Sequence, residues 1–255
     1  MDSEGRAAIV YAGTLSLAGV RFGYASFFLR EPGLPFRERA AAFGVTLPGE
    51  LAGVISFAHA GLAVESRHVP IAPPLERTLF DSLLGNLRWS CAAPCAEATI
   101  RIGDETISGL GYAESLRMTI APWDLPIDTL HWGRALARDR SATWIRWEGP
   151  EPLSLLVIDG IERPALRIEP HAVSWEGGAI DLVTEATLRD APIGGRLLST
   201  LPGIGRFAPT AILAAHETKW LSRARWSPAG TEDAGSFAIH EVVRFRPPRA
   251  PGAQK

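Results

Sequence analysis

The sequence is short of several features that would point to particular classes of protein. Lysine and arginine number 26 against 28 aspartates and glutamates, so the 255-residue chain carries a formal charge of −2. Binding to nucleic acid phosphates needs a basic excess on one surface, so nucleic acid is excluded as the main partner. No apolar run approaches the roughly 18–20 residues that span a bilayer, and the acidic start Met-Asp-Ser-Glu lacks the basic region of a secretory signal. These absences predict a cytoplasmic globular protein with a sizeable core.

Cysteine is also scarce. The two cysteines, Cys91 and Cys95, lie close together, and no paired histidines lie near them to complete the four-ligand set of a structural zinc site. A disulfide would close a very short loop in a compartment that we expect to be reducing. We therefore expect two unpaired thiols.

What the sequence does contain is many strand patterns separated by glycine and proline. Its 25 glycines and 20 prolines are spread along the chain, and apolar residues mostly recur at every second position, as in strands with one buried face. Helical spacing is found at 75–87 and more weakly at 35–43. An all-β antiparallel barrel or sandwich with one or two short helices is therefore predicted. Its strands are expected at 9–12, 21–29, 53–59, 62–69, 98–102, 105–120, 142–147, 153–158, 161–168, 179–188, 210–220 and 236–245.

A weak seam of glycine and proline at 149–152 suggests two lobes. We expect an N-terminal β lobe at 1–149 and a C-terminal β lobe at 150–246, followed by a disordered Pro-rich tail at 247–255. For the apolar connection at 192–207, the sequence leaves open a lid, a helix and a membrane-touching loop.

The strand pattern at 105–120 places a carboxyl group among apolar side chains. We expect the face that carries the large apolar residues to be buried. Burial raises the pKa of a carboxyl group, and an acid that is neutral at working pH suits general-acid catalysis. The sequence therefore predicts Glu114 as a proton donor, with Tyr112 orienting it or relaying the proton. The residues of this face are Leu110, Tyr112, Glu114, Leu116, Met118 and Ile120.

A second carboxyl group, that of Glu241, shares a predicted strand face with Phe237, Ile239 and Val243, whereas His240 points to the other side. A purely structural role is the alternative for both glutamates. A buried arginine, for which Arg134, Arg146 and Arg244 are candidates, would keep such a carboxylate ionised and lower its pKa.

The segment Leu130-His-Trp-Gly-Arg134 is suited to lining a pocket. Its glycine leaves space beside the ring of Trp132 and the guanidinium of Arg134, and an indole face can stabilise a cation. Arg134 is predicted to pair with Glu241 at the pocket floor. His131 and His216 are further candidate substrate contacts, although each is by itself more typical of a core or surface residue.

Known metal and nucleotide motifs are missing from the sequence. The pairs His216-Glu217 and His240-Glu241 lack the second histidine of a zinc-protease motif, because Trp220 and Arg244 occupy its place. There is no G-x-S-x-G, P-loop or dinucleotide fingerprint. No metal and no cofactor are therefore predicted.

Several segments resemble the carotenoid 1,2-hydratase (hydroxyneurosporene synthase) group. They are Gly109-Leu-Gly-Tyr-Ala-Glu114, Pro122-Trp-Asp-Leu-Pro126, Leu130-His-Trp-Gly-Arg134 and Phe237-Ala-Ile-His-Glu-Val-Val-Arg244. The resemblance implies a lipocalin- or calycin-like β-barrel, an architecture that tocopherol cyclases and fungal decalin-forming Diels–Alderases share. It also implies a carboxylic acid that protonates an alkene of a long apolar substrate, and aromatic side chains that stabilise the carbocation. The group's Gly-Tyr-His-Asp is Gly-Tyr-Ala-Glu here, which puts Glu114 in the place of the acid.

Taken together, the residues and the resemblance predict a cofactor-independent hydratase, cyclase or isomerase, of the lyase or isomerase class. Its substrate would be a lipophilic, isoprenoid- or polyketide-like molecule inside the barrel. The alternative is a non-catalytic carrier of hydrophobic small molecules, and a third reading is a structural protein with a filled interior. A transient membrane contact is left open, and the oligomeric state is not determined by the sequence.

Overall fold

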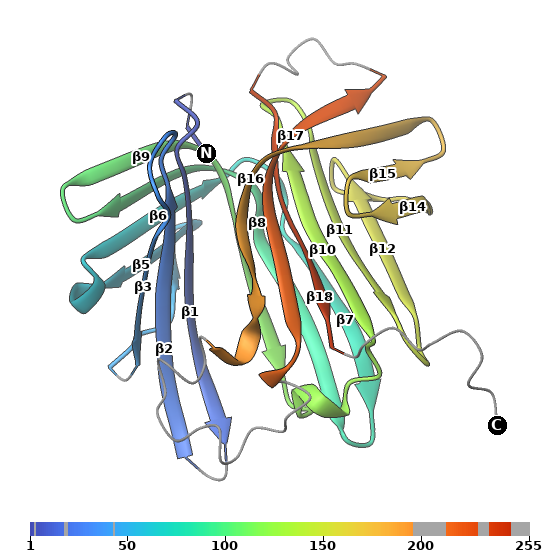
Figure 1. Ribbon diagram of the computed structural model, residues 1–255, viewed down its shortest axis with the longest axis horizontal. Coiled ribbons are helices and arrows are strands. Elements are labelled where there is room, and N and C mark those ends of the chain that lie inside the picture. Colours follow the sequence, from blue (N-terminus) through green and yellow to red (C-terminus); the bar gives the residue numbers. More distant parts are fainter. Residues whose placement is uncertain (3, 18–19, 43, 196–212, 229–234, 246–255) are drawn as a thin grey trace. The chain divides into compact units, whose positions relative to one another are not determined.

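The structure is a computed structural model that describes residues 1–2, 4–17, 20–42, 44–195, 213–228 and 235–245 (Figure 1). The described residues form strands β1 to β18, paired antiparallel wherever the register is given, together with the short 3₁₀ helices η1 (Ala60–Leu62) and η2 (Pro122–Asp124). The predicted all-β fold is confirmed. No helix in these described ranges has the length and apolar character needed to cross a membrane.

Internal contacts group the chain into two units. Unit 1 is made chiefly of Met1–Thr119, and unit 2 of Ile120–Ala135, Ala142–Ser199 and the chain from Ile204 onward. This grouping differs from the division expected after Gly149, because β10 (Thr129–Leu136) and β11 (Ser141–Glu148) belong largely to unit 2. The predicted tail at 247–255 and most of the connection at 192–207 lie outside the described residues.

Unit 1 contains two sheets. Phe27, Phe57 and Ile107 belong to a buried apolar cluster with residues from both sheets. One sheet has the order β1-β2-β3, from β1 (Ala7–Leu17), β2 (Val20–Arg30) and β3 (Arg37–Ala42). The other has the order β4-β5-β6-β8-β7, with β9 also paired to β8. Its strands are β4 (Gly49–Leu51), β5 (Val54–His59), β6 (Val64–Pro70), β7 (Leu75–Ser82), β8 (Gly85–Ile102) and β9 (Glu105–Met118).

The helix predicted at 75–87 is wrong, because this segment is the hairpin of β7 and β8. Leu75 and Leu79 are both buried, and a spacing of four residues returns to the same face of a strand as well as of a helix. A bulge between Thr78 and Phe80 then breaks the strand alternation, which hid the period of two. The weaker helix at 35–43 is likewise wrong, since it contains β3.

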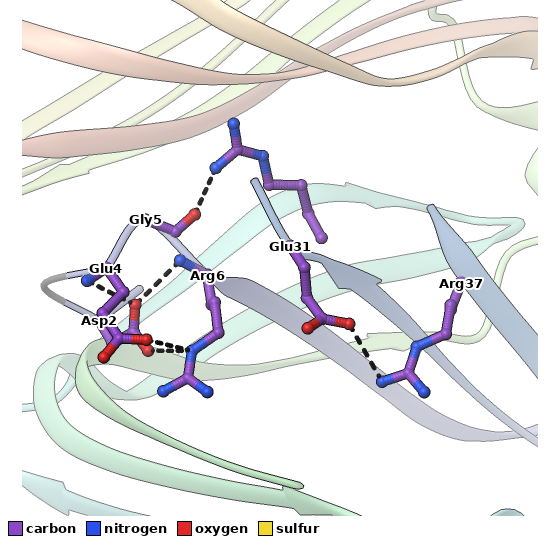
Figure 2. A network of polar contacts seen from close by, with 7 residues as sticks. Asp2, Glu4, Gly5, Arg6, Glu31 and Arg37 are labelled. Atoms are coloured by element: carbon purple, nitrogen blue, oxygen red, sulfur yellow. Dashed lines mark hydrogen bonds and ion pairs between the residues drawn. The ribbon is translucent and has the colours of Figure 1, made fainter. Parts of the chain in front are cut away.

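The N-terminal residues are tied into unit 1 by a polar network (Figure 2). The Met1 α-amino group donates to the Leu110 carbonyl of β9 at 2.7 Å. The Asp2 carboxylate accepts a hydrogen bond from the Arg6 backbone N–H at 2.9 Å and pairs with Arg6 Nε at 2.6 Å. These contacts hold the segment before β1 against β9.

Unit 2 is built on one nine-stranded sheet that forms a half-barrel, in the order β13-β12-β11-β10-β18-β17-β16-β15-β14. One face, called here the core face, carries a buried cluster that includes Trp144, Leu156, Ile180, Trp226 and Ala238. The other is called the opposite face. The strands are β10 (Thr129–Leu136), β11 (Ser141–Glu148), β12 (Leu153–Ile158), β13 (Ile161–Glu162), β14 (Ala165–Glu169), β15 (Ala172–Trp175), β16 (Gly178–Pro192), β17 (His216–Ser227) and β18 (Phe237–Arg244).

Strand β16 departs from regular pairing with β17 at two points. The register shifts between Thr184 and Ala186 and again between Thr187 and Arg189. Each shift adds one residue to β16, which reverses the alternation of side chains. The second shift restores it, and Arg189 therefore lies opposite Lys219 of β17.

Candidate functional site

The carboxyl group of Glu114 lies on the surface, which corrects the prediction that it is buried. Glu114 is exposed, as are Leu116 and Met118 on the same face of β9. Its Oε2 accepts a hydrogen bond of 2.6 Å from the indole Nε1 of Trp89, which is itself buried. Alternation shows which side chains share a face, but not whether another element covers that face. Glu114 therefore lacks the burial on which its predicted role was based, and Tyr112 of the same strand is half-buried.

A different group of predicted residues meets on the opposite face of unit 2. Strands β10 and β18 are neighbours. Their register follows from Gly133, where an added Cβ would lie 2.7 Å from the Cβ of His240, and from the hydrogen bond of Phe245 N–H to the Asp128 carbonyl. This antiparallel register places Trp132 opposite Glu241.

The line of facing side chains that begins with Trp132 and Glu241 continues across two more strands. Glu241 lies opposite Lys219 of β17, and Lys219 lies opposite Arg189 of β16. A half-buried indole, a carboxyl group, an ammonium group and a guanidinium group thus line up on four adjacent strands. Glu217, two residues before Lys219 on the same face, completes the set. We call Arg189, Glu217, Lys219 and Glu241 the charged cluster.

Two carboxyl groups of the charged cluster share one ammonium group. Lys219 Nζ lies 2.5 Å from Glu241 Oε2 and 2.8 Å from Glu217 Oε1. Arg189 Nε lies 3.0 Å from Glu217 Oε2. The side chains remain 21% exposed at Glu241 and 14% at Glu217. The cluster is thus largely withdrawn from water, but not sealed.

The pKa values of the two glutamates are shifted in opposite directions. Burial raises the pKa of Glu241, a shift that Lys219 opposes and that Glu217 reinforces. At Glu217, burial again acts to raise the pKa, but the positive charges of Lys219 and Arg189 outweigh it, and the pKa is lowered. The two side chains also hydrogen-bond to each other. One proton held on Glu241, beside an ionised Glu217, is the arrangement that these shifts favour.

Buried apolar side chains share the strand faces of Glu241 and Lys219. Phe237, Ile239 and Val243 share the face of Glu241 on β18 and are buried, and Leu221 follows Lys219 on the same face of β17. Glu241 thus has the environment that alternation predicted for Glu114, a carboxyl group among buried apolar residues. Its face was predicted correctly because β18 lies inside a sheet with neighbours on both sides.

Arg134 also lies on the opposite face and is buried. Its Nη1 donates to Thr143 Oγ1 at 2.9 Å, whereas Glu241 forms an ion pair with Lys219. The predicted pairing of Arg134 with Glu241 stays a prediction.

His131 and His216 lie on the core face and are therefore separated by the sheet from the charged cluster. His216 Nε2 is 2.7 Å from Asp190 Oδ1. His131 is buried, and burial, together with the charge of Arg146, lowers its pKa. The predicted residues thus belong to one sheet, but His131 and His216 lie on the face away from the charged cluster, and their role as substrate contacts stays a prediction.

The core face has its own layer of rings beside the apolar core. Trp220 and His240 stack with centroids 5.1 Å apart, and His171 meets Trp220 edge-on at 5.5 Å. His240 Nε2 and Ser222 Oγ are 2.8 Å apart and both residues are buried. Because both atoms are enclosed, this pair is suited to holding the layer together.

Sequence reasoning missed Arg189, Glu217 and Lys219 as site residues. Lys219 offered a signal, since it is one of only two lysines and alternates with Leu221 on a strand.

The structure shows a recess of about 200 Å³ in unit 1, lined by residues that include His59, Glu65 and Arg101, and none of the predicted site residues lines it. Within the described ranges, no three histidine, cysteine, aspartate or glutamate side chains are placed to hold a metal ion. Cys91 and Cys95 are both free and buried.

Solved structures share this fold at low sequence identity. A provisionally assigned AttH protein from Nitrosomonas europaea matches with a TM-score of 0.56 and 10% identity, over 94% of this chain and 87% of its own. CghA solved with Sch210972 matches with a TM-score of 0.54 and 9% identity, over 94% and 88%. No protein-family model and no curated protein matches the sequence. At these identities the comparisons show a shared all-β fold and nothing beyond it.

Proposed function

We propose that the protein is an acid–base catalyst that isomerises or cyclises a lipophilic, carbonyl-bearing small molecule, with Glu241 as the acid. The observation that carries this proposal is the sharing of Lys219 by Glu241 and Glu217 within an apolar surrounding. A carboxyl group with a raised pKa, next to one with a lowered pKa, provides both a proton donor and a proton acceptor.

The charges of the cluster favour a carbonyl substrate over a simple polyene. With Glu241 protonated, Lys219 and Arg189 face the single carboxylate of Glu217, so one positive charge is in excess. Positive charge stabilises an oxygen that gains electrons and destabilises a carbocation. Of the two predicted substrate types, this supports the polyketide-like one. Membership of the carotenoid 1,2-hydratase group stays a prediction from the motifs.

The proposed step conserves protons without a further reactant. Glu241 donates its proton to a carbonyl oxygen, Glu217 receives a proton from the adjacent carbon, and the substrate becomes an enol. In an isomerisation, Glu217 returns its proton to the far carbon of a conjugated double bond and the enol O–H proton goes back to Glu241. In a cyclisation, the enol carbon attacks a second carbonyl of the same molecule, whose oxygen takes the proton from Glu217 while the enol O–H proton goes back to Glu241. Trp132, opposite Glu241, would provide a flat apolar wall for the substrate.

The fold is compatible with this role. The CghA structure contains Sch210972, so a protein of the same fold accommodates a bound compound. At 9% identity this likeness concerns the fold alone, and the charged cluster carries the chemical argument. A cytoplasmic location remains a prediction.

Enolisation can be tested without knowing the natural substrate. The probe is a long-chain methyl ketone, 2-tridecanone, whose α-hydrogens exchange with D₂O only through the enol and are followed by proton NMR. We expect the full chain to accelerate exchange over protein-free buffer, and Glu241→Gln to lower the acceleration at least 100-fold, because general acid–base catalysis contributes about 10²–10⁴-fold.

Glu114→Gln is the matched control and should leave the exchange rate unchanged, since its carboxylate is exposed. Loss of exchange in this variant would show that Glu114, and not Glu241, is the acid. If the wild-type chain binds the ketone, as judged by a thermal shift, but exchange is no faster than in buffer, the carrier alternative is correct and catalysis by the cluster is not.

A further inference from the structure

The tip of the β7–β8 hairpin in unit 1 carries two adjacent exposed leucines, and one of them, Leu83, is the most exposed large apolar side chain among the described residues. Leu83 is fully exposed at 107% and Leu84 is exposed at 69%. They form the turn between Ser82 and Gly85, which lie opposite each other (cyan hairpin in Figure 1). Two adjacent leucines thus project from the end of a hairpin.

The geometry of the turn does not require leucine. Two-residue hairpin turns favour Asn, Asp and Gly, and here the turn is held by Ser82. Ser82 Oγ donates to the Gly85 carbonyl at 3.2 Å and accepts from the Leu84 backbone N–H at 3.2 Å. Burial in the protein core does not explain the leucines either, because both lie in solvent.

More apolar surface continues behind the tip. Met118 lies opposite Leu87, and Leu116 lies opposite Trp89, where β9 runs beside β8. Met118 is 36% exposed and Leu116 is 50% exposed. This apolar strip extends the surface of the tip along one face of the hairpin.

The other face carries two arginines directly opposite each other, Arg88 of β8 and Arg117 of β9. Like charges in this position destabilise a sheet. Neither arginine makes an ion pair with another described residue, and both are exposed. From Thr78 to Arg88 the hairpin carries one acidic residue, Asp81, opposite Asn86, so this end with Arg117 has one positive charge in excess; Glu76, opposite Ser90, lies farther from the tip.

We propose that this tip docks on the surface of an anionic lipid bilayer. The leucines would enter the boundary between headgroups and acyl chains, where apolar side chains gain from burial. Arg88 follows Leu84 by about 13 Å along the strand, at roughly 3.3 Å per residue, so its long side chain reaches the headgroup phosphates. A second copy of this chain is a poorer occupant, because a symmetric contact would bring both arginine pairs together.

Vesicle flotation of the full chain tests the proposal. Vesicles of phosphatidylcholine alone are compared with vesicles that contain 30% phosphatidylserine. We expect binding to the anionic vesicles. The double variant L83S/L84S should weaken binding about tenfold for each leucine, and R88Q/R117Q about fivefold for each arginine and only on the anionic vesicles.

The control is L51S/L166S, which removes two exposed leucines elsewhere, 81% and 72% exposed, and should float like the wild type. A tryptophan placed at the tip by Leu84→Trp should shift its emission to the blue when anionic vesicles are added. Wild-type protein that floats with neither vesicle overturns the proposal. Equal binding of L83S/L84S does so too, as does a dimer in solution that L83S/L84S converts to a monomer. None of these readouts depends on ketone exchange.

Discussion

Trp220 and His240 lie directly opposite each other on β17 and β18, and their rings stack at an interplanar angle of 26°. The stack removes the imidazole from water, since His240 is only 3% exposed. Burial, reinforced by the charge of His171, lowers the pKa of His240 to about 3. His240 is therefore neutral in the folded protein at any pH near neutrality.

The stability of the fold should decline as the pH falls below the ordinary histidine pKa of about 6.5. Between there and about pH 3 the unfolded chain binds a proton at His240 and the folded chain does not, so unfolding is favoured by up to about 1.4 kcal/mol per pH unit. Urea unfolding at pH 7.5, 6.5, 5.5 and 4.5 measures this slope. His240→Gln should reduce the slope, and His171→Gln, which removes the exposed ring of the same layer, should retain the part due to His240. An unchanged slope in His240→Gln would contradict the assignment.

Lys219 should be essential to the stability of the charged cluster. Lys219→Met leaves the carboxylate of Glu217 and the carboxyl group of Glu241 buried without their common partner, and breaking a buried pair in this way costs about 3–5 kcal/mol. Chemical denaturation at pH 7.5 provides the measurement. Lys219→Met/Glu217→Gln should lose less, because it removes the uncompensated carboxylate.

An exposed ion pair supplies the comparison. Arg223 Nη2 lies 2.8 Å from Glu185 Oε1, with the arginine side chain 61% exposed. Arg223→Met should cost less than about 1 kcal/mol, as surface pairs do. Equal losses at Lys219 and Arg223 would show that the cluster is open to water.

Gly133 should tolerate no larger residue. An added Cβ would lie 2.3 Å from the Trp144 ring and 2.7 Å from the Cβ of His240, so Gly133→Ala overpacks the layer and should destabilise the fold by at least about 1–3 kcal/mol. Gly13→Ala, in β1, is the matched control, since nothing lies within 4 Å of its added Cβ. A thermal unfolding midpoint for Gly133→Ala equal to that of Gly13→Ala would refute this packing.

The exposure of Glu114 has its own consequence for stability. Glu114→Ala should change the free energy of unfolding by less than about 1–2 kcal/mol, because the hydrogen bond that it removes from the Trp89 indole N–H ends on an exposed residue. Trp89→Ala should cost about 3–5 kcal/mol, because a large buried ring is lost. Should the two variants prove equally damaging in urea unfolding, the carboxylate is more enclosed than its exposure indicates.

Alternation of side chains was the most successful signal in the sequence. It assigned Glu241 and His240 to opposite faces of β18 correctly, because strands on both sides and buried residues around it make that strand regular. The same rule failed at Glu114, where the pattern is present but the strand end is uncovered. Alternation describes the strand itself, whereas burial depends on what packs against it.

The partners of Glu241 were out of reach of local sequence reasoning. Lys219 and Arg189 lie on other strands, and their alignment with Glu241 depends on the pairing register of β16, β17 and β18. Nothing in a single strand pattern reports that register. The prediction of a helix at 75–87 was wrong for a local reason. The bulge after Thr78 and the two leucines of the turn gave the apolar residues of two strands a helical spacing.

The two irregularities of β16 have opposite effects that cancel. The first turns the strand over and the second turns it back, so that Arg189 meets Glu217 on one side of the sheet while Asp190 meets His216 on the other. Deleting one of the extra residues, Glu185 or Leu188, would move Arg189 to the side of the sheet that carries His216 and Asp190 to the side that carries Glu217. It would bring an aspartate toward an already acidic pair and a guanidinium toward an imidazole. Losing both together would keep each charge on its own side, so this strand is expected to accept length changes in pairs and to reject single ones.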